Sequence, residues 1–364
     1  MTLKAPIGAI RRILAKFPSC WLMIFCVGSL LGTESRTANT APADVLFQAH
    51  TAAFYREKDG LAWFQESTEG GKVSYWMRAE QMEMVLDAYE RTHQAQPLIM
   101  FTNLFRGFLA DHGTNWGHNP FNDDIMWMVM ACTRAHLLTG NPDFRAVART
   151  NFDLCFARAN STNLGGGLWW KVDNRSKNAC VNGPGAIAAF LLGQATGEGN
   201  YFRIATNLFE WERATLFDAS TGRVSDNIRT NNRISSMALT YNQGTFVGAA
   251  NLLGYTNEAM LAATFTMNQL CRNGYLPPAG EKGDGGGFNG IGARWIARFM
   301  KERKAEGVFG PWLRKNAEAA WAARRASDNL AWCRWPEPTP EAEKRYSWGC
   351  SSAVVLLQVA PPAD

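Results

Sequence analysis

The chain has no apolar segment long enough to cross a membrane. A membrane-spanning helix needs about 20 predominantly apolar residues, and the most apolar stretch of these 364 residues, CWLMIFCVGSLL at Cys20 to Leu31, is shorter. Basic residues precede it and the small, polar SRTANTAPA follows, which is typical of a secretory signal peptide. We therefore expect residues 1–40 to be a signal peptide and linker, the protein to be secreted or periplasmic, and no stable membrane span to remain after cleavage. An uncleaved anchor is the alternative.

Beyond that segment the chain also lacks an excess of charge. Residues 1–40 hold five of the 37 Lys and Arg residues and one of the 32 acidic residues, which leaves 32 basic against 31 acidic residues. Binding to nucleic acid needs a clustered basic surface. We therefore expect no nucleic-acid partner.

Metal-ligand spacings are missing as well. The six cysteines after residue 40 form no CxxC pair, and the five histidines are scattered, whereas zinc sites use short, recurrent Cys and His spacings. We expect no metal or organic cofactor. Cys132 and Cys155 lie in apolar helical patterns that predict buried free thiols. Cys333 and Cys350 flank a Pro-rich loop and are the best candidates for a disulfide in an exported protein.

What the sequence does contain is an internal repeat of about 60 residues. Segments that begin at Asn122, Asn182 and Asn242 each combine an Asn, an apolar helical run, a break at TG or YT, and a second helix. In the first segment, residues 125–138 are apolar nearly all round, as in a buried helix. The helix from Asp143 has one apolar stripe, as in a helix that covers a core. Each repeat therefore predicts an inner helix, a short turn and an outer helix.

The fold class that follows is all-α. Six inner and six outer helices would form an (α/α)6 barrel, as a single domain over residues 41–364. Long loops rich in Gly, Asn, Trp and Asp lead into the inner helices, so we expect them to gather at one end of the barrel and to carry the function. Outside the first repeat, we expect inner helices over 75–89, 288–300 and 348–358, outer helices over 44–56, 95–110, 199–213, 256–272 and 311–325, and short strands around 169–172 and 223–226.

One motif invites a cofactor interpretation that we reject. GPGAIA, Gly183 to Ala188, matches the GxGxxG/A pattern of dinucleotide-binding sites. That pattern requires a buried strand immediately before it, and the preceding KNACVN is not such a strand. The repeat places this stretch at an inner helix, where small residues serve close packing.

Asp123 and Asp124 stand side by side at the start of the first buried helix. Taken alone, the pair predicts helix capping, since acids in the first turn gain about 0.3–1 kcal/mol each from the helix dipole. The equivalent positions of the other repeats are Gly183–Pro184 and Gln243–Gly244, so the scaffold does not need two acids there. Two carboxylates in one cleft do not both ionise easily, and such a pair suits glycoside hydrolysis. We expect the member closest to the helix N–H groups to be ionised and its neighbour to keep a proton, which yields one nucleophile or base and one acid.

Further motifs follow one another along the chain in a recognisable order. They are NDD with Trp127 (122–127), GGGLWW (165–170), KNACVNG (177–183), TGRVSD (221–226), TYNQGTFVGA (240–249) and FNGIGARW (288–295). In this order they resemble glycoside hydrolase family 76, the endo-α-1,6-mannanases with an (α/α)6 barrel. The double Asp before an inner helix is the most specific part of the resemblance.

The resemblance implies roles for individual residues. Asp123 would be the nucleophile and Asp124 the general acid/base of a retaining mechanism, so we expect Asp123 to be ionised and Asp124 to be protonated before turnover. Indole rings would flank the groove and polar side chains would bind mannose hydroxyls. The residues so implied are Trp169 and Trp170 for the groove, Asn182, Asp226, Tyr241, Asn242 and Gln243 for the hydroxyls, and Arg294, which would orient a carboxylate or pair on the surface.

We therefore expect a monomeric, endo-acting retaining enzyme that cleaves the backbone of α-1,6-mannan, with mannan or manno-oligosaccharides as its substrate. Three alternatives stay open at this point. The same site would serve a mannan transglycosylase. A catalytically silent glycan-binding protein would keep the groove alone. Another (α/α)6 sugar enzyme, such as an unsaturated glucuronyl hydrolase, would act on uronides.

Overall fold

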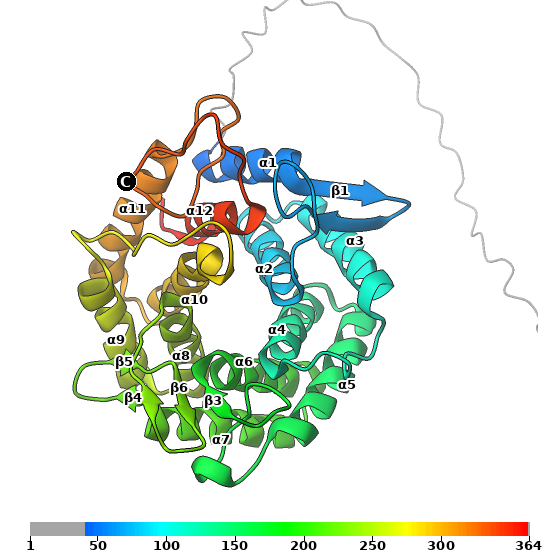
Figure 1. The fold of residues 1–364 in the computed structure, drawn as a ribbon, viewed down its shortest axis with the longest axis vertical. Coiled ribbons are helices and arrows are strands. Elements are labelled where there is room, and N and C mark those ends of the chain that lie inside the picture. The colour runs from blue at the N-terminus through cyan, green and yellow to red at the C-terminus, as the bar shows by residue number, and fades with distance from the viewer. Residues whose placement is uncertain (1–40, 363–364) are drawn as a thin grey trace, which may run out of the picture. The chain divides into compact units, whose positions relative to one another are not determined.

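Six helices form a closed ring at the centre of this computed structural model, which describes residues 41–362 (Figure 1). Each of the six contacts the next in chain order, and the last contacts the first. The expected signal peptide lies outside the described residues. The inner helices are α2 (Tyr75–Thr92), α4 (Asn122–Thr139), α6 (Ala179–Thr196), α8 (Thr240–Leu253), α10 (Phe288–Glu302) and α12 (Ser347–Val359).

The other six helices lie outside this ring and pack on it (Figure 1). Helices therefore alternate between the inner and outer layers along the chain, and the twelve α-helices of the described residues confirm the predicted (α/α)6 barrel. The outer helices are α1 (Pro42–Phe54), α3 (Ala95–His112), α5 (Pro142–Ala159), α7 (Gly199–Thr215), α9 (Thr256–Phe265), which continues in a π-helical turn (Thr266–Leu270), and α11 (Glu306–Ala322).

Burial separates the two layers as the apolar patterns predict. Every residue of α4 from Ile125 to Ala135 is buried, whereas α5 buries one stripe that includes Phe144, Ala148 and Phe152. The inner helices also approach one another closely. A Cβ at Gly244 of α8 would lie 2.6 Å from Cα of Gly292 in α10, so only glycine fits where these backbones touch.

GPGAIA lies inside α6, as expected, and its glycines serve packing. A Cβ at Gly183 would lie 2.9 Å from Oγ1 of Thr245. The helix begins at Ala179, three residues before Asn182. The repeats are therefore not in the same helical register, because α4 begins at its Asn and α6 begins nearly one turn earlier.

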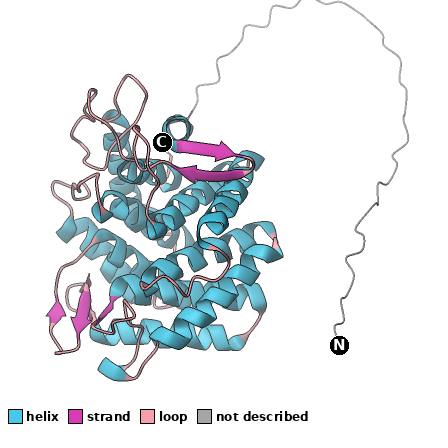
Figure 2. Cartoon of the chain, turned by 45° about the vertical axis from the view of Figure 1, so that its right-hand side comes forward, coloured by secondary structure: helices cyan, strands magenta, loops and turns pink. Residues whose placement is uncertain are grey.

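Short strands decorate the barrel (Figure 2). The strand expected around 223–226 is present as β5, but the one around 169–172 is wrong, since a single bridge between Phe121 and Lys171 stands there. The hairpin of β1 and β2 was not predicted. The predicted helix ran to residue 56, but α1 ends at Phe54 and β1 begins at the next residue. The strands form three antiparallel sheets: β1 (Tyr55–Lys58) with β2 (Leu61–Phe64), β4 (Phe217–Asp218) with β5 (Arg223–Val224), and β6 (Asn227–Arg229) between β3 (Ser176–Asn178) and β7 (Ile234–Ser235).

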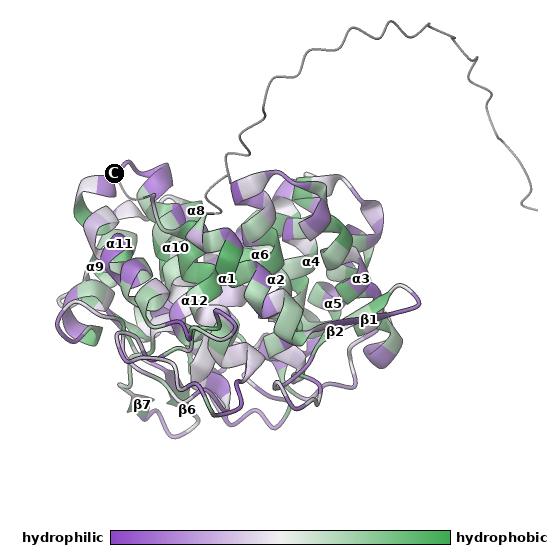
Figure 3. Cartoon of the chain, turned by 90° about the horizontal axis from the view of Figure 1, so that it is seen from above, coloured by the Kyte–Doolittle hydropathy of each residue, from purple (hydrophilic) through white to green (hydrophobic). Residues whose placement is uncertain are grey.

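Long loops gather at one end of the barrel, together with β6 and β7 (Figure 3). They include two 3-10 turns, Asn163–Gly165 and Asp284–Gly287, and they lead into the N-termini of inner helices. The expectation that the loops share one end is therefore confirmed. Within residues 41–362, no helix has the length and apolar character of a membrane span.

The disulfide predicted between Cys333 and Cys350 is wrong. Both are buried free thiols, and the Cys333 Sγ donates to the carbonyl of Ala279 at 3.3 Å. Cys132 and Cys155 are buried free thiols, as predicted.

Candidate active site

The Asp pair occupies the first turn of α4, at the end of the barrel where the loops gather. Phe121 is the N-cap residue, and its side chain makes no capping bond within the described chain. Asn122 follows, buried, and its amide donates to the carbonyl of Trp169 at 2.8 Å. This bond ties the helix start to the loop that precedes α6. Asp123 and Asp124 therefore sit in the helix dipole without serving as the cap.

Asp123 is held by two donors on one oxygen. Its Oδ2 accepts from the indole N–H of Trp170 at 2.8 Å and from the thiol of Cys180 at 3.4 Å. Its Oδ1 is screened from solvent and has no hydrogen-bond partner among residues 41–362. Buried polar atoms are normally paired, so this unpaired oxygen marks a place where a ligand atom would be favoured.

Asp124 turns to a different loop. Its Oδ2 accepts from the side-chain amide of Asn119 at 2.9 Å, and the Oδ1 of Asn119 accepts from the backbone N–H of Phe121. Arg158 of α5 donates to the carbonyl of Asn119 and to the side chain of Asn122. The two carboxyl groups are thus oriented by separate sets of donors.

Burial is the largest influence on both carboxyl groups. It raises the pKa of Asp123 to about 8, with a contribution from the charge of Asp124, and the bonds from Trp170 and Cys180 oppose this rise. It raises the pKa of Asp124 to about 6, where Asn119 opposes and the nearby charge of Asp284 adds to the rise. At pH values between about 6 and about 8, the pair as a whole therefore carries one proton.

Burial thus raises the pKa of both carboxyl groups, and the expected division, in which Asp123 is the ionised member, stays a prediction. The first turn of α4 was expected to keep Asp123 ionised. At Asp123 the loss of hydration outweighs the donors, and Oδ1 has no hydrogen-bond partner among residues 41–362.

Aromatic rings line the barrel mouth beside the pair. Tyr241 stacks on Phe288 with ring centroids 3.9 Å apart. The centroid of the Trp76 ring lies 6.0 to 6.5 Å from those of Trp127, Tyr241 and Phe288, and the rings are tilted to one another. The Trp76 indole donates to Asp284 at 3.2 Å. Flat faces next to carboxylates suit the apolar face of a sugar ring.

Asp226, Tyr241 and Asn242 come together near the pair, as the sequence implied. Asp226 accepts from the amide of Asn242 at 3.1 Å, and the Oδ1 of Asn242 is buried without a partner in the described chain. Burial raises the pKa of Cys180 and Tyr241, and the charges of Asp123 and Asp226 both add to that rise. The Asp226 carboxylate therefore belongs to the same neighbourhood as Asp123.

Three residues implied to contact sugar are instead used inside the protein. Asn182 has no exposed surface and bonds the backbone of Leu168 in both directions. Gln243 is equally buried, and its amide holds the backbone at Gly222 and Val224. Trp169 is 3% exposed and packs under an ammonium group, so it is not a surface for stacking. Trp170, by contrast, keeps partial exposure beside Asp123.

Arg294 lies deeper in the barrel than the Asp pair. Its guanidinium group orients two carboxylates, which belong to Glu80 and Asp87 of α2. The nitrogen-to-oxygen distances are 2.6 and 2.8 Å. Arg294 is buried, not paired on the surface. Arg134 of α4 joins the same network through Asp87 and two further acids. Arg294 therefore serves the interior of the barrel, and the structure does not bring it to Asp123 or Asp124.

Four residues of the site were missed from sequence. Asn119, Cys180 and Asp284 lie in or next to the loops that were expected to carry function, and Trp76 begins an inner helix. Their residue types alone gave no reason to choose them from many similar ones. Within the described chain, no three His, Cys, Asp or Glu side chains are grouped so that they could hold a metal ion.

Solved structures and curated proteins resemble this chain. The α-1,6-mannanase GH76A of Salegentibacter sp. HEL1_6 superposes with a TM-score of 0.80, at 28% identity, over 87% of this chain and 97% of that one. An inactive variant of that enzyme, with Asn at two consecutive Asp positions, is in complex with α-1,6-mannotriose and superposes equally well. A family 76 mannosidase from Bacteroides thetaiotaomicron shares the fold, with a TM-score of 0.76 at 17% identity over 87% of this chain and 96% of that one.

The mannan endo-1,6-alpha-mannosidase DFG5 of Saccharomyces cerevisiae is 26% identical over 219 residues. The match covers 51% of this chain and 42% of the yeast protein, so the chain matches less than half the length of that relative. The family model for glycosyl hydrolase family 76 matches residues 39–358. With nearly the whole barrel matched, the resemblance seen in the sequence is confirmed, and the chain belongs to glycosyl hydrolase family 76.

Proposed function

We propose that this protein is a retaining endo-α-1,6-mannosidase that cleaves the backbone of α-1,6-mannan. The observation that carries the proposal is the orientation of Asp123, whose Oδ2 accepts from Trp170 and Cys180 while Oδ1 has no side-chain or backbone partner in the described part of the chain. The sequence contains a single pair of consecutive aspartates. The inactive Salegentibacter mannanase is altered at two consecutive aspartates, which supports assigning the chemistry to this pair.

In the proposed mechanism, Asp124 gives its proton to the glycosidic oxygen while Oδ1 of Asp123 attacks C1, and the C1–O bond to the leaving sugar breaks. Asp124, now ionised, takes a proton from water as the water oxygen attacks C1 and releases Asp123. The proton must rest on Asp124 when the sugar is bound. The donors from Trp170 and Cys180 favour this by stabilising the ionised Asp123.

Linear α-1,6-mannan tests the reaction. The wild-type protein should release manno-oligosaccharides that retain the α-configuration, and Asp123→Asn and Asp124→Asn should each abolish cleavage. Asp143→Asn is the matched control, because Asp143 also lies in the first turn of a helix but on the outer layer. Unchanged cleavage by both active-site variants would refute the assignment.

The roles of the two aspartates need a separate experiment, because burial raises the pKa of both carboxyl groups and does not by itself separate the nucleophile from the acid. A slow fluorinated mannosyl substrate should leave a covalent label on Asp123, identified by peptide mass mapping. A label on Asp124 would exchange the two roles. Binding of mannan without any cleavage would instead indicate a glycan-binding protein, and products longer than the substrate would indicate a transglycosylase.

A further inference from the structure

Lys177 carries a buried ammonium group that is enclosed by one loop. The residue lies in β3, has no exposed surface, and points to the loop that links α5 to the Trp169–Trp170 segment. All its side-chain hydrogen bonds go to oxygens of that loop. The three N–H groups of Nζ share five acceptors, which are the carbonyls of Asn163 (2.7 Å), Ser161 (2.9 Å), Gly167 (2.9 Å) and Gly166, and Oγ of Ser161 (3.0 Å).

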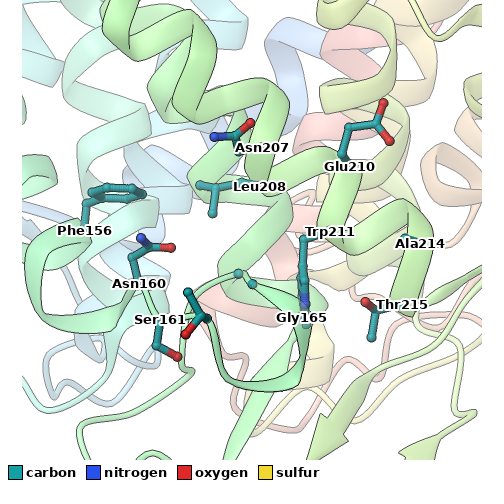
Figure 4. Close-up of a pocket in the computed structure, with 13 residues that line it drawn as sticks. Phe156, Asn160, Ser161, Gly165, Asn207, Leu208, Glu210, Trp211, Ala214 and Thr215 are labelled. Atoms are coloured by element: carbon teal, nitrogen blue, oxygen red, sulfur yellow. The ribbon is translucent and has the colours of Figure 1, made fainter.

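The same loop rests on a single ring. The Trp211 indole N–H donates to the carbonyl of Leu164, and a Cβ at Gly167 would lie 2.4 Å from the Trp211 ring. Gly167 also has a φ of +75°, which favours glycine. The outer side of the loop borders an open hollow of about 640 Å³ between α5 and α7, with Phe156 and Asn207 on its walls (Figure 4). Asn182 holds the end of the loop through the backbone of Leu168, whereas Lys177 and Trp211 hold its outer part, residues 161–167.

The loop leads directly to the catalytic pair. Nζ of Lys177 lies 4.7 Å above the ring of Trp169. The next residue is Trp170, whose indole N–H reaches Oδ2 of Asp123. We propose that Lys177 is a positioning residue, which holds residues 161–170 in the one conformation that brings the Trp170 indole to Asp123. This inference rests on the proposed function.

An ammonium group is a costly way to fill a space, since burying a charge is unfavourable unless hydrogen bonds replace its hydration. Burial does lower the pKa of Lys177, to about 8. An apolar side chain would fill the space without that cost, but it would leave the loop carbonyls at Ser161, Asn163 and Gly167 without their donor. What the lysine adds is therefore a fixed loop conformation.

A double-mutant cycle tests the inference, with thermal unfolding as the check of the fold. We expect Lys177→Met and Trp170→Phe each to lower kcat on α-1,6-mannan about tenfold or more, the effect of losing a hydrogen bond to a charged group. Both should move the alkaline limb of the pH profile upward, because the Trp170 bond holds the Asp123 pKa down. The double variant should be no worse than the stronger single one. Losses that multiply, or a fall in unfolding temperature without change in kcat, would overturn the inference.

Two further variants keep the test decisive if Lys177→Met does not fold. Ser161→Ala removes the one side-chain acceptor, and Lys177→Arg keeps the charge in another shape; both should shift the alkaline limb in the same direction but less. Lys315→Met is the matched control, since Lys315 also donates to a carbonyl and lies over an aromatic ring, but on the outer helix α11. An unshifted limb in both variants would refute the inference. If Asp123→Asn abolishes activity but the effects of Lys177→Met and Trp170→Phe are independent of each other, the proposed function stands and this inference alone is refuted.

Discussion

The indole N–H of Trp170 lies 2.8 Å from Oδ2 of Asp123, although 47 positions separate the two residues. Trp170→Phe should keep the ring and remove the donor. Because this bond lowers the pKa of Asp123, its loss should raise that pKa and move the alkaline limb of kcat/KM to higher pH, with kcat about tenfold lower or more. Trp332→Phe, which removes an indole donor on a distant loop, should change neither. An unmoved limb in Trp170→Phe would mean that the bond does not tune Asp123.

The wild-type pH profile should be bell-shaped. One carboxyl must be ionised and the other protonated, and burial raises the pKa of Asp124 to about 6 and that of Asp123 to about 8. Activity should therefore fall below the first value, where both carboxyls are protonated, and above the second, where both are ionised. Initial rates on α-1,6-mannan at low substrate concentration would measure both limbs, and a profile with a single limb would contradict the shared proton.

Asp284→Asn should move only the acidic limb. The charge of Asp284 raises the pKa of Asp124, so its removal should lower that pKa and extend activity to lower pH. The alkaline limb should stay in place, since Asp284 is not among the groups that act on Asp123. The same pH series on Asp143→Asn serves as the control, and an acidic limb that moves upward would show that Asp284 acts in another way.

Arg294→Met should destabilise the fold. Glu80 and Asp87 are buried and lose an ion-pair partner in this variant, and breaking a buried pair costs about 3–5 kcal/mol. Arg298→Met on the same helix removes an exposed pair with Glu302 and should cost about 1 kcal/mol or less. Denaturant unfolding of both variants measures the difference. Equal, small losses would show that the interior network is not needed for stability.

Gly244→Ala tests the contact between α8 and α10. Alanine is the better helix former by about 0.5–1 kcal/mol, but its Cβ would lie 2.6 Å from Cα of Gly292. Backbone atoms cannot yield as a side chain does, so we expect a net loss of about 1–3 kcal/mol. Gly199→Ala at the start of α7, where a Cβ meets nothing within 4 Å, should be neutral or stabilising in the same unfolding experiment.

The architecture was predictable because its signals are local. A helix buried on all sides and a helix with one apolar stripe differ within a dozen residues, as α4 and α5 show. Chain order then places neighbouring hairpins side by side. The ends of elements were less predictable: α6 begins three residues before Asn182, because loop contacts, not apolar periodicity, decide where a helix starts.

The site was only partly predictable. The Asp pair stood out because sister helices lack acids, and Trp170, Asp226, Tyr241 and Asn242 do lie near it. Asn182, Gln243 and Arg294 looked equally suitable for the site from sequence. In the structure, Asn182 and Gln243 bond backbone groups and Arg294 pairs with buried carboxylates. A residue type does not reveal whether its hydrogen-bonding capacity is already used.

By itself, then, the sequence determined the helical layers, the end of the barrel at which the loops gather, and the carboxyl pair at the start of α4. Only the tertiary structure decided which groups surround that pair. Cys180 and Trp170 contact Asp123 from 57 and 47 positions away in the chain. Asp284 acts on Asp124 from the 3-10 turn that leads into α10. Such contacts arise when the ring closes and the loops meet over its mouth, and that closure depends on the packing of all twelve helices in the described chain, not on any local pattern.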